Sequence, residues 1–168
     1  MKASAAIRVV FLSILFLISS LFCVAQIITG KVIRVTDGDS ITISDSQGKS
    51  IRVRLFGIDC PEVGQPFSKN ATEHTKQLCE GKDVRVDVKH IDRYKRTVGV
   101  VYTPENIDLN LSLLTNGLAW HYRYFDQSVL YEQAENTAKL KKKGIWSSNN
   151  PVAPWDYRKN KKNKKKKK

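Results

Sequence analysis

Residues 37–62 read DGDSITISDSQGKSIRVRLFGIDCPE, and this stretch decides the fold. It opens with a turn at Asp37-Gly38-Asp39, since Asp tolerates turn geometry and Gly can supply a positive φ. Two runs with alternating apolar residues follow at 41–43 and 51–55, separated by a second turn signal at 47–49. The pattern predicts a short β meander, and after its last strand the chain continues as a loop at 57–62.

Four charged side chains lie at the ends of this predicted meander. Asp39, Asp59 and Glu62 supply carboxylates, and Arg54 faces away from the side of Leu55. Carboxylate oxygens bind hard cations such as Ca²⁺, and the planar fork of arginine suits a phosphate. A carboxylate left free of the cation could orient or deprotonate water. The combination indicates phosphodiester hydrolysis, although each residue alone also fits an ordinary turn, strand or loop position.

The same stretch resembles the calcium-dependent thermonucleases of the staphylococcal nuclease family. The family's first signature appears as DGDS at 37–40, Arg54 and DCPE at 59–62, and its second as DRYKR at 92–96. The similarity extends from about residue 28 to residue 146. It implies an α+β fold: a five-stranded OB-fold-like β-barrel with three α-helices. The residue pattern alone indicates only an α+β fold with an antiparallel sheet.

The resemblance also implies roles for particular residues. Asp39 and Asp59 would bind Ca²⁺ through their carboxylates, and Cys60 through its backbone carbonyl. Arg54 and Arg96 would bracket the scissile phosphate while negative charge builds up on it. Glu62 would position or deprotonate the attacking water. Substrate binding would fall to a further set of residues: Arg93, Tyr94, Tyr122 and Tyr124. The two later tyrosines fit a core-closing role equally well.

Alternation and helical periodicity place the remaining elements. Strands are expected at 27–35, 84–88 and 98–102, in addition to the two strands of the meander. Helices are expected at 67–79, 109–116 and 128–143, with Gly81, Gly117 and Gly144 as their stop signals.

The ends of the chain differ from its body. Residues 1–25 have the basic start and short apolar run of a signal peptide, which predicts a secreted or periplasmic protein. A lipoprotein modified at Cys23 and an uncleaved anchor are the alternatives. Residues 26–147 form the expected thermonuclease-like domain. Residues 148–168 are expected to form a proline-containing linker and a disordered lysine-rich tail.

Positive charge is concentrated in that tail. The chain has 29 basic and 16 acidic residues. Residues 158–168 hold nine of the basic residues and no acid, and Lys2 and Arg8 lie in the leader, so residues 26–157 carry 18 basic residues against 16 acidic ones. Such a tail could hold nucleic acid or another anionic surface by non-specific, salt-sensitive attraction. A solvated tail without a partner is the alternative.

The cysteines and histidines give weaker signals. Cys60 and Cys79 could form a disulfide in an exported protein. Cys79, however, falls on the same predicted helical face as Ala71 and Thr75, which favours a small core residue. His74, His90 and His121 have no zinc-ligand spacing, so they are interpreted as surface or packing residues.

The leading hypothesis is a Ca²⁺-dependent nuclease that acts as a monomer. By the resemblance, it would hydrolyse DNA and RNA without sequence specificity and leave 3′-phosphate ends. The first alternative is a non-catalytic nucleic-acid-binding OB-fold module. The second alternative is a basic surface or matrix protein whose tail is the functional segment.

Overall fold

The computed structural model describes residues 26–166. The signal peptide expected at 1–25 lies outside this range. Within it, no helix is long and apolar enough to cross a bilayer.

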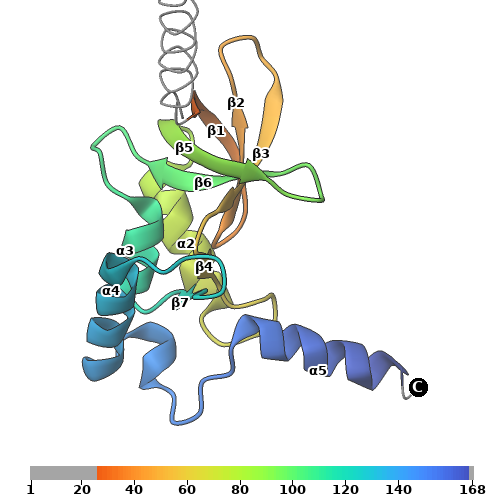
Figure 1. Cartoon of the computed structure of the whole chain (residues 1–168), viewed down its shortest axis with the longest axis vertical. Coiled ribbons are helices and arrows are strands. Elements are labelled where there is room, and N and C mark those ends of the chain that lie inside the picture. The colour runs from red at the N-terminus through yellow and green to blue at the C-terminus, as the bar shows by residue number, and fades with distance from the viewer. Residues whose placement is uncertain (1–25, 167–168) are drawn as a thin grey trace, which may run out of the picture.

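Five strands close into a barrel in the order β1-β2-β3-β6-β5. Their bounds are β1 Ile27–Asp37, β2 Ser40–Ser44, β3 Ser50–Leu55, β5 Asp83–Ile91 and β6 Thr97–Tyr102. All neighbouring pairs are antiparallel except β3 and β6, which run parallel. The five-stranded OB-fold-like barrel expected from the resemblance is therefore confirmed (Figure 1).

A two-stranded sheet extends the barrel toward the helices. It pairs β4 (Ile58–Asp59) with β7 (Trp120–His121), so that Asp59 lies opposite Trp120. This pairing was not predicted, because two-residue strands show no periodicity in a sequence.

The expected helices are present with slightly shorter bounds: α2 Ser68–Cys79, α3 Leu109–Thr115 and α4 Val129–Leu140. Asp108 and Ser128 cap α3 and α4 by accepting hydrogen bonds from Leu111 N and Tyr131 N. A 3₁₀ turn, η1 (Gly144–Ser147), buries Ile145 and Trp146 after α4.

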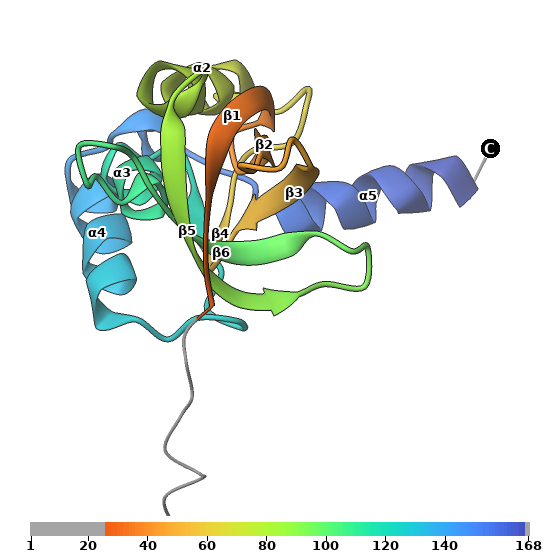
Figure 2. The same ribbon diagram turned by 90° about the horizontal axis from the view of Figure 1, so that it is seen from above.

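A further helix, α5 (Pro154–Lys166), occupies most of the segment for which a disordered tail was expected. Pro154 suits the first helical position, because its missing N–H would have no partner there. Figure 2 shows α5 extending away from the barrel, opposite α4.

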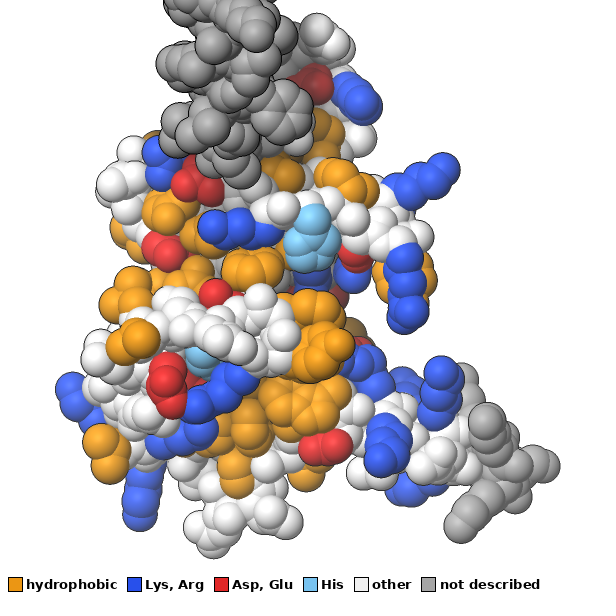
Figure 3. Space-filling model, in the orientation of Figure 1, with side chains coloured by type: hydrophobic (Ala, Val, Ile, Leu, Met, Phe, Trp, Pro, Cys, Tyr) orange, Lys and Arg blue, Asp and Glu red, His pale blue; other side chains and the backbone are white. Residues whose placement is uncertain are grey.

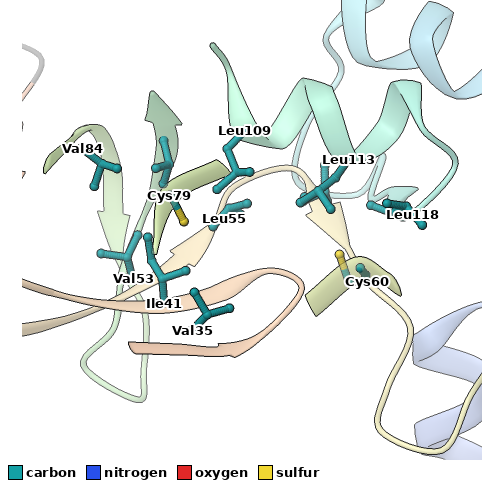
Figure 4. Packing of buried hydrophobic residues seen from close by; sticks show 14 of the residues in the cluster. Val35, Ile41, Val53, Leu55, Cys60, Cys79, Val84, Leu109, Leu113 and Leu118 are labelled. Carbon is teal, nitrogen blue, oxygen red and sulfur yellow. The ribbon is translucent and has the colours of Figure 1, made fainter. Parts of the chain in front are cut away.

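The core fills the space between the barrel and α2 and α3. The inward residues of alternating positions, such as Ile41, Ile43, Val53 and Leu55, are at most 2 % exposed. Cys60 and Cys79 are free and buried, and Figure 4 shows them apart within this cluster. The interpretation of Cys79 as a core residue is confirmed.

Candidate active site

The Asp37-Gly38-Asp39 turn joins β1 to β2 and is held against α2. Asp37 Oδ1 accepts a hydrogen bond from Asp39 N at 3.2 Å, and the buried Thr75 hydroxyl donates to Gly38 O at 2.6 Å. A Cβ on Gly38 would lie 2.7 Å from Ala71 Cβ and 2.8 Å from Cys60 Sγ. Glycine is therefore required here by close packing. Its φ is not positive, so the conformational reason inferred from the sequence was wrong.

Arg54 lies on β3 and joins the two aspartates. Its Nη1 forms an ion pair with Asp39 Oδ1, and its Nη2 lies 2.6 Å from Asp59 Oδ1. Arg54 is 19 % exposed, whereas the Asp39 and Asp59 side chains are 2 % and 1 % exposed. Burying carboxylates without a partner would be costly, so this guanidinium holds both charges in place.

Cys60 contributes its backbone to the same cluster. Its N–H donates to Asp39 Oδ2 at 2.6 Å, which fixes the second oxygen of that carboxylate. Burial raises the pKa of the Cys60 thiol far above its ordinary value. The thiol therefore stays protonated and does not act as a nucleophile.

Glu62 lies at the rim, in a loop closed by Gln65. Glu62 N donates to Gln65 Oε1 at 2.8 Å, and Gln65 Nε2 donates to Val152 O at 3.0 Å. Glu62 is 38 % exposed, so water reaches its carboxylate. The loop is thereby linked to the segment that precedes α5.

A second arginine enters the cluster from α5, and no sequence pattern predicted it. Arg158 Nη2 lies 2.7 Å from Asp59 Oδ2, and Arg158 Nη1 lies 3.2 Å from Asp59 Oδ1 and 2.6 Å from Glu62 Oε1. Burial acts to lower the pKa of Arg158, but its hydrogen bonds to Asp59 and Glu62 outweigh this effect and raise it. The guanidinium is charged, and it connects Glu62 to the buried Asp59.

Arg96 does not contact this cluster within residues 26–166. Its Nε pairs instead with Asp92 Oδ2 at 2.8 Å in the β5–β6 turn. Burial acts to raise the pKa of Asp92, but hydrogen bonds from Arg96 and Tyr94 outweigh it and lower that pKa. The strand register nevertheless brings the turn near Arg54, because the neighbouring Thr97 pairs with Val53.

The four expected substrate residues fall into two groups. Arg93 and Tyr94 lie in the β5–β6 turn, with the Arg93 guanidinium 4.9 Å from the centre of the exposed Tyr94 ring. Tyr122 and Tyr124 lie in the segment that follows β7. Tyr122 stacks on Trp155 at 5.0 Å, whereas Tyr124 is 83 % exposed. A shallow pocket lies between β7, α4 and Trp155, lined by Trp120, Tyr122 and Lys139 among others.

Comparison with known proteins decides the family. Residues 52–148 match the family model described as "Staphylococcal nuclease homologue". The chain belongs to the staphylococcal nuclease family. It is 39% identical over 131 residues to an "Uncharacterized endonuclease" of Escherichia coli, which covers 78% of this chain and 85% of that protein.

Other relatives of this nuclease agree. A "Micrococcal nuclease" of Shigella flexneri is 37% identical over 145 residues, covering 80% of this chain and 82% of that protein. The "Staphylococcal-like nuclease CAN1" of Arabidopsis thaliana is 42% identical over 113 residues, but the match spans only 35% of its length. The nuclease is a hydrolase of phosphodiester bonds.

By the resemblance, a cation would be held by the carboxylates of Asp39 and Asp59 and by the backbone carbonyl of Cys60. In the part of the nuclease that the structure describes, no three or more Asp, Glu, His or Cys side chains lie together as a metal site. The guanidiniums of Arg54 and Arg158 bind the carboxylates of Asp39, Asp59 and Glu62 directly. The donor set consists of carboxylate and carbonyl oxygens, which fit a hard cation such as Ca²⁺.

Proposed function

We propose that this nuclease is Ca²⁺-dependent and hydrolyses DNA and RNA without reading their sequence, leaving 3′-phosphate ends. The observation that supports the proposal is the convergence of Asp39, Asp59 and Arg54 at the end of the barrel. Glu62 lies beside them at the exposed rim. When bound, the cation would supply electrostatic stabilisation of the phosphate.

Arg54 and Arg96 are assigned to the phosphate. An arginine has five N–H donors. Within the described residues, Arg54 uses its terminal nitrogens on Asp39, Asp59 and the Ile58 carbonyl, which leaves donors for a phosphate oxygen. Among the described residues, the side-chain hydrogen bond of Arg96 uses Nε, so its terminal nitrogens remain for the substrate. Donors aimed at the phosphate stabilise the charge that builds up during attack.

Glu62 is assigned to the water. Its carboxylate is half-exposed, and its backbone is fixed by Gln65. It can accept a hydrogen bond from the attacking water, orient it and take up its proton.

Lack of sequence specificity follows from the kind of contacts proposed. Arginines directed at phosphate fix the position of the strand but carry no information about its bases. Exposed aromatic residues such as Tyr94 and Tyr124 can stack on any base.

The test is cleavage of DNA and RNA in Ca²⁺ and in excess chelator, with Glu62→Gln as the variant. We expect turnover only in Ca²⁺ and a loss of about 10²–10⁴-fold in the variant, the usual contribution of a general base. Glu80→Gln, at the exposed end of α2, is the matched control and should cleave normally. Equal cleavage with chelator contradicts Ca²⁺ dependence. DNA binding without cleavage in Ca²⁺ would instead support the non-catalytic binding module.

We also propose that the enzyme is exported to the periplasm or the medium. The basic start and short apolar run of residues 1–25 support this. N-terminal sequencing of the exported protein should begin near Gln26. Recovery of the full chain in the cytoplasm contradicts export.

A further inference from the structure

The C-terminal helix places the guanidinium of Arg158 on Asp59, which is assigned to the metal, and on Glu62, which is assigned to the water. Arg158 forms two hydrogen bonds with Asp59 and one with Glu62, at 2.6–3.2 Å. Both Asp59 oxygens and one Glu62 oxygen are thereby engaged. The Asp59 oxygens are atoms that a bound cation would need, and a cation placed beside them would be repelled by the Arg158 guanidinium.

We propose that Arg158 is a built-in competitor of the divalent cation, so that α5 restrains the nuclease until the cation displaces it. The inference rests on the cation site assigned under the proposed function. It adds a regulatory residue that lies outside the region matched to the family, which ends at residue 148.

Charge balance supports displacement. Asp39, Asp59 and Glu62 supply three negative charges, and Arg54 and Arg158 supply two positive ones. A divalent cation added to both arginines would leave a net positive cluster in which the cations repel one another. Release of one arginine returns the net charge of the cluster to zero.

The exposed fractions of the two arginines indicate which one a cation would displace from the cluster. Arg54 is 19 % exposed and is fixed in the barrel by β2 and β6, whereas Arg158 is 44 % exposed and lies on the last helix. Removing Arg54 from the cluster would disturb the barrel. Removing Arg158 requires only that α5 shift.

Aromatic contacts next to the site hold α5 in place. Trp155 stacks on Tyr122 with an interplanar angle of 16°, and its ring centre lies 5.7 Å from that of Trp120. Beyond Arg158, the described side chains of residues 159–164 are all exposed. Figure 3 shows Lys and Arg side chains along this projecting part. Contacts near 151–158 therefore hold α5, and this small contact area can open without unfolding the barrel.

The expected change in Ca²⁺ affinity follows from the fraction of molecules in which Arg158 is released from the carboxylates. When a ligand binds only the open form, its apparent Kd rises in inverse proportion to the open fraction. An open fraction of roughly one in ten would weaken cation binding about tenfold.

The test is calorimetric Ca²⁺ binding to the full chain without nucleic acid. Arg158→Gln should bind Ca²⁺ about tenfold more tightly than the wild type. Lys159→Gln removes the same charge one residue away and should not change the affinity. Equal or weaker binding by Arg158→Gln overturns the inference.

Asp59→Asn separates the two proposals. If this variant binds Ca²⁺ as the wild type does, the cation site itself is misplaced and the proposed function fails. If it no longer binds Ca²⁺ while Arg158→Gln binds no more tightly than the wild type, only the competition fails.

Hydrogen exchange of the wild type gives an independent readout. Amides of residues 155–164 should exchange faster when saturating Ca²⁺ is added, because α5 is released. Unchanged or slower exchange contradicts displacement, whatever the folding of the variants.

Discussion

At the scale of single residues, the site depends on buried charges that hold one another. Asp39 and Asp59 are almost completely buried, and Arg54 pairs with both. The sequence predicted these three residues correctly as neighbours, because a turn, a strand of known alternation and a loop bring them to one end of a meander. Arg158 could not be predicted, since it lies 99 positions from Asp59 in a segment without periodicity.

Replacement of Arg54 should therefore affect stability as well as turnover. Arg54→Ala leaves the buried Asp39 carboxylate without its guanidinium partner and Asp59 with Arg158 alone, and breaking a buried pair costs about 3–5 kcal/mol. Urea unfolding should show this decrease in stability, whereas Glu62→Gln, at the exposed rim, should change the unfolding free energy by less than about 1 kcal/mol. An Arg54→Ala protein as stable as the wild type would contradict the structural role of the guanidinium.

At the scale of elements, the barrel strands and three helices were predictable and α5 was not. Alternating apolar residues specify β2, β3 and β5, and Gly81, Gly117 and Gly144 mark where the three expected helices stop. Residues 154–166 lack an apolar stripe, so composition indicated disorder. The structure instead attaches α5 by Trp155 and Arg158, which a periodicity argument does not detect.

The contact between α2 and α3 predicts a pH dependence. His74 of α2 hydrogen-bonds with Ser112 of α3 at 2.9 Å, and burial lowers the His74 pKa below its usual 6.5. The unfolded chain thus takes up the proton more readily than the folded one. This contribution to stability is present above about pH 6.5 and disappears as the pH falls through the lowered pKa.

Urea midpoints of wild type and His74→Gln at pH 7.5 and pH 5.5 check this expectation. The variant should lose less stability between the two pH values than the wild type. An identical decrease in both proteins would show that other groups cause it.

At the scale of the whole molecule, a nearly neutral body carries a basic extension beside its candidate active site. The helix α5 projects from the rest of the fold (Figure 1), and Lys and Arg side chains gather along this projecting part (Figure 3). This arrangement would draw a polyanion toward the site through its phosphates, without regard to sequence. The uneven charge was evident from the sequence, but its position next to the carboxylates required the fold.

Replacing four α5 lysines with Gln should weaken DNA binding and its salt dependence. The slope of log affinity against log salt should fall by up to about 0.9 for each phosphate that the lysines no longer neutralise. Fluorescence anisotropy with a duplex in chelator measures this for the set Lys159, Lys161, Lys162 and Lys164. The control set of exposed lysines elsewhere is Lys31, Lys49, Lys69 and Lys141. Equal slopes of log affinity against log salt in the two sets of variants would show that the tail does not contribute to DNA binding.

The most direct measurement of the central claim is the nature of the ends produced from a 5′-labelled oligonucleotide in Ca²⁺. Phosphatase treatment distinguishes products with 3′-phosphates from those with 3′-hydroxyls. We predict 3′-phosphate ends that appear only with Ca²⁺, at a rate that falls by orders of magnitude in Glu62→Gln. Products with 3′-hydroxyl ends, or cleavage that survives the removal of the Glu62 carboxylate, would contradict hydrolysis by this cluster.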